Sequence, residues 1–398
     1  MKRTINDLDL FRKKVFIRVD FNVPMADGRI TDDTRIRSSL PTIQYALAHG
    51  ATAVVASHLG RPKGVNTAPA FSLRPVSARL AELVGRDVTF VDDCVGSAVA
   101  LAVEKVHGAG GGVVMLENLR YHPGEEKNDP AFAKALAAPV DAYVDDAFGA
   151  AHRAHASVAA ITKFVPQAAA GFLMEQELKY LGEALEHPVR PFVAILGGAK
   201  VSDKLDVIEN MLGKVDRLLI GGAMAYTFLK AQGKPIGRSL VEDDKLEAAN
   251  ATVADAAKRG VRLELPVDHV VTDALQEGSS SEVLQIGDPA IGNRYGVDIG
   301  PATIAAYETF IRGAKTVVWN GPMGIFEIGA FARGTMAVAK AVAAVDGTTI
   351  VGGGDSIAAV KQAGVADRIT HISTGGGASL EFLGGRTLPG VAALPDAP

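Results

Sequence analysis

The fold is decided by the stretch Thr348-Thr349-Ile350-Val351-Gly352-Gly353-Gly354-Asp355-Ser356-Ile357-Ala358-Ala359-Val360. Thr349 to Val351 predict a short buried β-strand, and the apolar residues from Ile357 to Val360 predict the start of a helix. Three glycines, an aspartate and a hydroxyl lie between them. A strand that leads through a glycine turn into a helix is typical of parallel α/β sheets.

The turn in this stretch has two interpretations. Glycines let backbone N–H groups approach a phosphate closely, and a helix N-terminus adds partial positive charge. Asp355 could then hold a magnesium ion that bridges the phosphates, because Mg²⁺ prefers oxygen ligands and few protein contacts. In the other interpretation, Asp355 or Ser356 only caps the helix. The stretch by itself leaves both open.

Length and composition set the class of protein. The chain has 398 residues, 48% of them hydrophobic, 43 glycines and a net charge of −4. Its length favours two domains, and the small charge implies no general attraction to nucleic acid or membrane. Cys94 is the only cysteine, which excludes an intrachain disulfide and zinc-finger spacing. Residues 1–9 contain no apolar signal core and no apolar run approaches about 18 residues, so we expect a cytoplasmic protein.

Expected strands and helices alternate through the first half of the chain. We expect strands at 15–19, 53–56, 88–91, 113–116 and 142–144, and helices at 38–49, 75–83 and 98–106. This alternation predicts a doubly wound parallel sheet, in which ligands bind at the carboxyl ends of the strands.

Polar and basic side chains follow the ends of these strands. They are Asp20, Asn22, Arg35, His58, Arg61, Arg120 and Arg153. Arginines that face one crevice repel one another unless an anion neutralises them, and guanidinium groups suit phosphate and carboxylate oxygens. We therefore infer a site for a small, doubly anionic ligand, with Asp20 and Asn22 free to hydrogen-bond a hydroxyl. The alternative is that surface arginines pair with the nearby acids Asp32, Asp145 and Asp146.

A helix is expected between the two halves, because Met174, Leu178, Leu181 and Leu185 fall at near-helical spacing. It joins two domains or belongs to one of them. Beyond it, expected strands run repeatedly into glycine turns, at 195–198, 218–222, 316–321, 349–354 and 369–377.

Several such turns on one sheet point to a nucleoside triphosphate, with Lys200, Lys204 and Asp355 available for phosphates and metal. One glycine pair would be weak evidence, since helix–strand packing can require it. The sequence contains neither Gly-Lys-Ser/Thr nor G-x-G-x-x-G, so P-loop and dinucleotide folds are not supported. A dehydrogenase on this fold would need that missing fingerprint, and a non-catalytic binding protein for phosphorylated acids would need only the arginines.

These motifs resemble those of the phosphoglycerate kinase family. The matching segments follow the family's order through nearly the whole chain and are residues 18–24, 57–62, 117–120, 146–155, 197–204, 319–322, 352–356, 375–379 and 388–391. There are two departures. Ser356 stands where many relatives have threonine, and residues 328–330, which follow Glu327, are less typical.

The resemblance implies an α/β fold of two doubly wound parallel-sheet, Rossmann-like domains with a cleft between them. The implied parts are residues 1–171 plus 386–398 for binding 3-phosphoglycerate, 172–187 as an interdomain helix and 188–385 for binding nucleotide. The implied activity is reversible phosphoryl transfer between ATP and the carboxylate of 3-phosphoglycerate, with Mg²⁺, by a monomeric glycolytic enzyme that has no nucleic-acid or membrane partner.

The resemblance also implies roles for particular residues. Those that would bind 3-phosphoglycerate are Asp20, Phe21, Asn22, Arg35, His58, Leu59, Gly60, Arg61, Arg120 and Arg153. Those that would bind ATP or ADP are Lys200, Lys204, Gly221, Gly222, Gly300, Asn320, Glu327, Gly353, Gly354, Asp355 and Ser356. Glu327 would hold the ribose and Asp355 the metal. Those expected to contact the transferring group are Arg35, Lys200, Gly354 and Gly376.

The implied chemistry needs few other groups. A carboxylate nucleophile with a pKa of roughly 3.5 is ionised at neutral pH, so no general base is required. The remaining task is to position the reactants and neutralise charge on the phosphoryl group. We expect hinge closure near residues 172–187 to exclude water when both ligands are bound.

Overall fold

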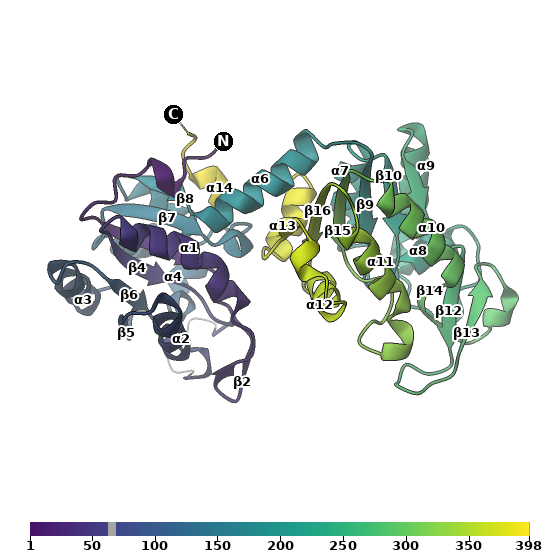
Figure 1. Cartoon of the computed structure of the whole chain (residues 1–398), viewed down its shortest axis with the longest axis horizontal. Coiled ribbons are helices and arrows are strands. Elements are labelled where there is room, and N and C mark those ends of the chain that lie inside the picture. The colour runs from purple at the N-terminus through teal and green to yellow at the C-terminus, as the bar shows by residue number, and fades with distance from the viewer. Residues whose placement is uncertain (63–68, 398) are drawn as a thin grey trace. The chain divides into compact units, whose positions relative to one another are not determined.

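The computed structural model describes residues 1–62 and 69–397, which form two compact units. Unit 1 comprises Met1–Lys179 and Thr387–Pro398, and unit 2 comprises Tyr180–Arg386. The division falls within helix α6 (Phe172–Glu186), the helix expected at 172–187 (Figure 1). Helix α14 (Pro389–Ala393), near the C-terminus, belongs to unit 1.

Unit 1 is built on a sheet of six parallel strands. Their order is β5 (Val88–Val91), β6 (Val113–Leu116), β4 (Thr52–Ala56), β1 (Lys14–Val19), β7 (Ala142–Asp146) and β8 (Ala168–Ala170). The chain starts with β1 in the middle, places β4 beside it and β5 at the edge, and returns with β6 between these two. It then continues on the other side of β1 with β7 and β8. This arrangement confirms the predicted doubly wound sheet.

The two faces of β1 bury different side chains because successive residues of a strand point to opposite faces. Ile17 and Val19 pack with Ile36 and Ile43 of α1 (Thr34–Ala48). Helix α2 (Arg74–Val84) joins the same core, whereas the other face of β1 carries the fully buried Arg18. The remaining helices of unit 1 are α3 (Ser97–Gly108), α4 (Pro123–Glu126) and α5 (Pro130–Ala137).

Two of the boundaries in unit 1 that differ from the expectation bear on the site. Helix α1 begins at Thr34 rather than Ser38, so Arg35 lies in its first turn. It follows a short hairpin of β2 (Met25–Ala26) and β3 (Arg29–Ile30). Strand β7 extends to Asp146, and both Asp145 and Asp146 are fully buried. The alternative in which surface arginines pair with Asp145 and Asp146 is therefore not supported.

Unit 2 repeats the architecture of unit 1. Its parallel sheet has the order β11 (Arg262–Glu264), β10 (Arg217–Ile220), β9 (Phe192–Leu196), β15 (Thr316–Asn320), β16 (Thr348–Gly352) and β17 (His371–Ile372). The winding direction changes between β9 and β15. The last strand is shorter than the 369–372 that the sequence predicted.

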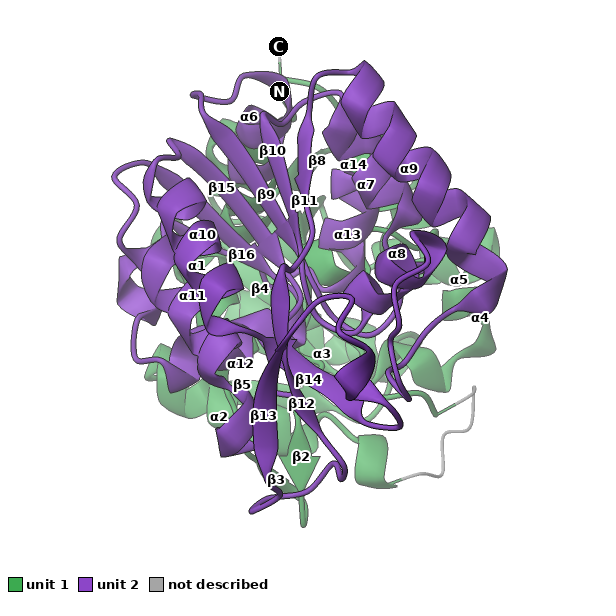
Figure 2. Cartoon of the chain, turned by 90° about the vertical axis from the view of Figure 1, so that its right-hand side faces the viewer, with its two compact units in different colours: residues 1–179, 387–398 green, residues 180–386 purple. Residues whose placement is uncertain are grey.

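Helices cover both faces of the unit 2 sheet. Figure 2 shows α10 (Pro301–Arg312), α11 (Arg333–Ala343) and α12 (Gly354–Gln362) on one side. On the other side lie α7 (Leu205–Leu212), α8 (Met224–Ala231) and α9 (Leu246–Lys258), with α13 (Gly377–Leu383) packed against α7. Because both faces are covered, every residue of β9 is buried.

A small antiparallel sheet in unit 2 was not predicted. It consists of β13 (Ser281–Gln285), β12 (Asp268–Thr272) and β14 (Tyr295–Ile299), in that order. Helix α12 also begins earlier than expected, at Gly354, which places Asp355 and Ser356 in its first turn.

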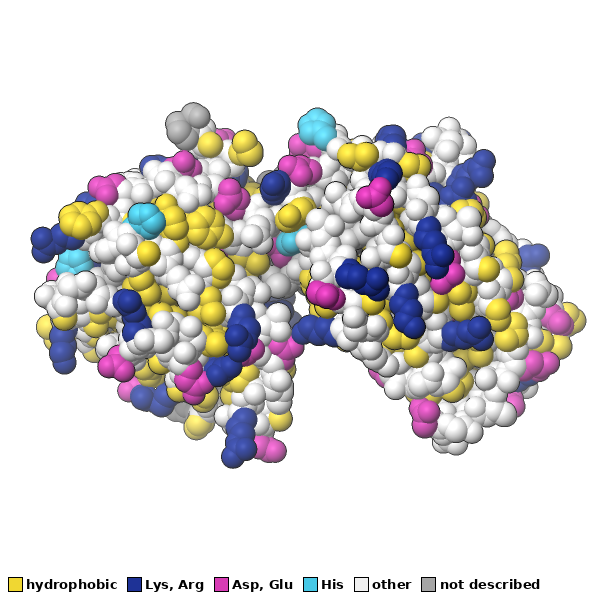
Figure 3. Space-filling model, in the orientation of Figure 1, with side chains coloured by type: hydrophobic (Ala, Val, Ile, Leu, Met, Phe, Trp, Pro, Cys, Tyr) yellow, Lys and Arg dark blue, Asp and Glu magenta, His cyan; other side chains and the backbone are white. Residues whose placement is uncertain are grey.

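The surface carries both signs of charge. Figure 3 shows basic and acidic side chains interspersed on both units, in keeping with the small net charge of −4. Among the residues that the structure describes, no helix has the length and apolar character needed to cross a membrane.

Truncation of the central strand of unit 1 should destabilise that unit. Ile17 is fully buried in β1, so Ile17→Ala should lower the free energy of unfolding by about 2–5 kcal/mol. The control is Leu101→Ala on α3, where the side chain is 71% exposed and the change should stay within about 0.5 kcal/mol. Urea unfolding followed by circular dichroism measures both, and equal effects would contradict this packing.

Candidate active site

The polar residues predicted for the acidic ligand gather at the carboxyl edge of the unit 1 sheet. An Arg35 nitrogen lies 2.8 Å from the Asp20 carboxylate, and the pair is partly buried. Asn22 accepts a hydrogen bond from the Gly60 amide at 2.9 Å, and the Gly60 carbonyl accepts one from Arg120 at 2.8 Å. These contacts join the segments that follow β1, β4 and β6.

His58 is held as a neutral ring with a defined tautomer. Arg18 Nη2 lies 3.1 Å from His58 Nδ1. Since a guanidinium group can only donate, Nδ1 must accept and the ring proton sits on Nε2. Burial, followed by the charges of Arg18 and Arg120, holds the pKa of His58 well below its usual range. Nε2, 3.9 Å from Asp20 Oδ1, is thus a neutral donor at this edge.

Arg18 is the residue that sequence reasoning missed. It is fully buried in β1 and donates to Ser157 Oγ at 2.8 Å as well as to His58. Ser157 is held in turn by the buried carboxylate of Glu125, at 2.6 Å from the Ser157 hydroxyl. An arginine in the middle of an apolar strand was the signal that could have identified it.

Only part of the positive charge at this edge is neutralised by acids. Arg35 pairs with Asp20, and Arg120 Nε lies 3.5 Å from a Glu126 oxygen. Arg153 donates to the ring of His152 at 3.1 Å, which brings it no negative charge. Arg61 is exposed just beyond Gly60. The arrangement favours an anionic ligand.

Two of the residues named for this site have structural roles, as does Asp146 at the end of β7. The Phe21 side chain is fully buried in the core, and its amide donates to Ser57 Oγ at 2.8 Å. The backbone of Leu59 is bonded on both sides to the Asn118 side chain. Asp146, whose pKa is raised to about 8 by burial, accepts from the amide of Leu173 at the start of α6.

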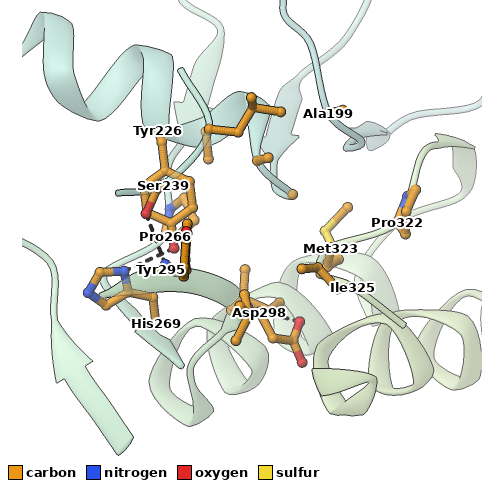
Figure 4. Close-up of a pocket in the computed structure, with 18 of the residues that line it drawn as sticks. Ala199, Tyr226, Ser239, Pro266, His269, Tyr295, Asp298, Pro322, Met323 and Ile325 are labelled. Atoms are coloured by element: carbon orange, nitrogen blue, oxygen red, sulfur yellow. Dashed lines mark hydrogen bonds between the residues drawn. The ribbon is translucent and has the colours of Figure 1, made fainter. Parts of the chain in front are cut away.

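Unit 2 contains a cavity of about 480 Å³ beside the carboxyl ends of β9 and β15. It lies where the winding direction of the sheet changes, which is where open α/β sheets bind ligands. Figure 4 shows Met323 and Ile325 on one side of it and Tyr226, Tyr295 and Pro266 on the other. An apolar lining of this kind suits a flat aromatic base.

Several polar groups at the back of this cavity are paired within the protein, although His269 Nε2 is buried without a hydrogen-bond partner among the described residues. The Tyr226 hydroxyl lies 3.0 Å from His269 Nδ1, and the Ser239 hydroxyl accepts from the Gly296 amide at 2.9 Å (Figure 4). The Asp298 carboxylate accepts from the Gly334 amide at 2.6 Å, and burial raises its pKa to about 7. Sequence reasoning named none of these residues.

Three of the residues predicted for the nucleotide line this cavity, and others belong to neighbouring turns. Gly222, Glu327 and Asp355 line it. Lys204 donates to Asn320, and burial lowers the pKa of Lys204 to about 8. The Ser356 hydroxyl accepts from the Gly321 amide at 2.6 Å, so it links the first turn of α12 to the turn that follows β15. Lys200 is exposed.

The predicted glycines divide into two groups. A Cβ on Gly221 would lie 2.3 Å from Met323 Sδ, and one on Gly222 would lie 2.5 Å from the Gly198 amide nitrogen, so both are needed for close packing of neighbouring turns. Gly300 does not line the cavity, and a Cβ on it would lie 2.2 Å from Asp268 Cγ, so this glycine is needed for close packing. A Cβ on Gly354 or Gly376 would meet nothing within 4 Å. These two are open to a ligand.

Gly353 supplies the sharp turn into α12. Its φ of +88° is one that favours glycine, and a Cβ there would lie 3.0 Å from Asn320 Nδ2. Asp355 does not cap the helix, because the N-cap is Gly353, which has no side chain. The exposed Asp355 carboxylate beside the amides of the first turn fits a magnesium ion that also binds phosphates, since Mg²⁺ needs few protein ligands.

Comparison with known proteins shows which family this chain resembles. The model of the family described as phosphoglycerate kinase matches residues 5–386. The chain belongs to the phosphoglycerate kinase family. It is 60% identical to a phosphoglycerate kinase of Solibacter usitatus over 98% of both chains. It is 58% identical to that of Acidobacterium capsulatum over 99% of both.

Solved structures of phosphoglycerate kinases share the fold. The enzyme from Coxiella burnetii has a TM-score of 0.89 and 42% identity, and the match covers 99% of this chain and 98% of that one. The enzyme from Pyrococcus horikoshii has a TM-score of 0.84 and 33% identity, with 98% of each chain covered.

The buried histidine behind the arginines should make stability depend on pH. Burial, followed by the charge of Arg18, lowers the pKa of His155 from 6.5 to about 3. As the pH falls below 6.5, the unfolded chain binds a proton that the folded chain does not, so the contribution of His155 is present above 6.5 and is lost below it. The free energy of unfolding of the wild type minus that of His155→Gln should fall by about 2 kcal/mol from pH 7 to pH 5. A constant difference would contradict this.

Proposed function

We propose that this chain transfers a phosphoryl group reversibly between ATP and the carboxylate of 3-phosphoglycerate, giving ADP and 1,3-bisphosphoglycerate. The observation that carries the proposal is the match to the phosphoglycerate kinase family from residue 5 to 386, a range that includes both sites. A non-catalytic binding protein would have no use for the cavity of unit 2 beside Asp355.

The acidic substrate suits the carboxyl edge of unit 1. Its phosphate carries two negative charges, and the planar guanidinium groups of Arg61, Arg120 and Arg153 can each donate two parallel hydrogen bonds to such oxygens. The Nε2–H of His58 adds a donor that is uncharged through the neutral range, because burial and the nearby arginines lower the pKa of the ring. Asp20 and Asn22 would form hydrogen bonds with the hydroxyl of the substrate.

The nucleotide suits the cavity of unit 2. The base would lie against Met323, Ile325 and Tyr295, and Glu327 would accept from the ribose hydroxyls. The phosphates would lie at the first turn of α12, where the N–H groups have no partner within the helix. Lys200, Lys204 and Asn320 would contribute side-chain donors, and Asp355 would hold Mg²⁺, which neutralises phosphate charge when it is bound.

The transfer itself requires positioning and charge stabilisation rather than proton transfer. The attacking carboxylate is already ionised, so neither His58 nor any other base is needed. Arg35, Lys200 and the backbone amides at Gly354 and Gly376 would donate to the oxygens of the transferring group. Hinge closure near α6, a monomeric state and a cytoplasmic location stay predictions.

Arg35 and Lys200 are the two basic residues assigned to the transferring phosphoryl group. Removing either side chain should lower kcat more than it weakens substrate binding. Arg35→Ala and Lys200→Ala should each reduce kcat by at least about 10²-fold with a smaller change in KM, because the lost donor acts mainly in the transition state. A coupled assay with ATP, Mg²⁺ and 3-phosphoglycerate measures this.

Matched controls lie close by. Arg37→Ala removes another arginine of α1, and Lys258→Ala removes an exposed lysine of α9; both should keep normal turnover. Arg35→Lys keeps the charge but loses the planar fork, and should recover only part of the rate. If both alanine variants turn over normally, the assigned roles are wrong.

The role of Asp355 is tested by the dependence on metal. Asp355→Asn should raise the Mg²⁺ concentration needed for half-maximal rate by at least about tenfold, since it removes the charged ligand. The control is Asp367→Asn, an exposed aspartate of the same unit, which should leave the requirement unchanged. An unchanged requirement in Asp355→Asn would remove it from the metal site.

A further inference from the structure

Unit 1 contains a group of potential metal ligands that the proposed reaction does not use. Within residues 1–62 and 69–397, Asp93, Cys94 and His122 bring a carboxylate oxygen, a thiol sulfur and a ring nitrogen within 4.8 Å of one another. Asp93 and Cys94 follow β5, and His122 follows the short 3-10 helix Leu119–Tyr121. The group therefore lies at the outer end of the carboxyl edge of the sheet.

The three side chains are already held near one another. His122 Nε2 lies 2.7 Å from Asp93 Oδ1, which also accepts from the Cys94 amide at 2.6 Å. The Cys94 thiol donates to the Glu117 carbonyl at 2.9 Å. The His122 ring stacks on Phe132, with ring centroids 4.8 Å apart. Little rearrangement is needed to bring the three donors around one ion.

Exposure gives the group an entry side and a closed side. The side chains of Asp93 and His122 are 45% and 27% exposed, whereas Cys94 is 2% exposed. An ion can thus enter past the carboxylate and the ring and meet the sulfur beneath them. Water can complete the coordination from the open side.

The donor set selects the class of metal. Zinc is bound by sulfur, nitrogen and oxygen ligands about 2.0–2.3 Å from the ion, so tetrahedral ligands stand roughly 3.4–3.8 Å apart. The most widely separated donors would have to approach by about 1 Å, and the 2.7 Å contact between His122 Nε2 and Asp93 Oδ1 would have to widen. A thiolate together with an imidazole disfavours Mg²⁺ and Ca²⁺. We propose that Asp93, Cys94 and His122 bind one thiophilic divalent cation, such as Zn²⁺.

Binding must displace a proton from sulfur. Burial raises the pKa of the Cys94 thiol well above its usual range, so the metal-free protein carries a thiol that bonds to Glu117. On binding, the thiol proton goes to solvent and the sulfur bonds the metal as thiolate. His122 Nε2 gives up its proton and its hydrogen bond to Asp93, and the neutral ring that binds through Nε2 carries its one proton on Nδ1. The affinity should therefore rise with pH.

Cobalt(II) provides a direct test, because a cobalt–thiolate bond gives a charge-transfer band in the near ultraviolet. Untagged, metal-free protein titrated with Co²⁺ should develop this band with one equivalent. Zn²⁺ should abolish the band, and excess Mg²⁺ should not. Cys94→Ser should abolish it, and His122→Gln should weaken Co²⁺ binding by at least about tenfold, since even the loss of an outer partner of a ligand costs about 10–100-fold.

The control is His107→Gln, which alters another histidine of unit 1 that bonds to Thr52 and should keep the band. If Cys94→Ser does not fold, His122→Gln and Asp93→Asn, which alter partly exposed side chains, carry the test. Absence of a thiolate band in the wild type would overturn the proposal. So would a band that both of these variants keep at unchanged affinity.

Discussion

Parallel pairing of the central strands is the constraint on which both sites depend. In unit 1, Arg18 of β1 lies beside Ala56 of β4 and Asp145 of β7, so the segments after all three strands begin at one edge. In unit 2, Leu196 of β9 lies beside Ile220 of β10 and Asn320 of β15. Each sheet changes winding direction next to these strands, which leaves room there for a ligand.

Buried charge decides what the edge of unit 1 can bind. Arg18 lies behind His58, fixes its tautomer and helps to keep the ring neutral. The ring is thereby a donor, and the guanidinium groups around it supply the charge. In unit 2 the close-packed glycines Gly221 and Gly222 hold neighbouring turns together, which leaves the open turn at Gly354 to face a ligand.

Strand positions could be predicted from the sequence, and the ends of several elements could not. The strands at 88–91 and 113–116 agree with the prediction because short apolar runs between turns are a strong local signal. The start of α12 at Gly354 was missed because a glycine lacks helix propensity and the turn is fixed by packing against Asn320.

Sequence placed the arginines at the strand ends. Only the structure distinguishes Gly300, which packs on Asp268, from the glycines at which a Cβ would meet nothing. The structure also reveals the role of Arg18 and the apolar lining of the cavity.

The most direct test of this account is a crystal structure of the chain with 3-phosphoglycerate and a nucleotide bound. The account predicts the substrate phosphate within hydrogen-bond distance of the arginine groups and His58 Nε2 at the carboxyl edge of unit 1. It predicts the nucleotide phosphates at the first turn of α12, with Mg²⁺ on Asp355. A substrate phosphate that contacts none of these arginines, or nucleotide phosphates away from Gly354 and Asp355, would contradict it.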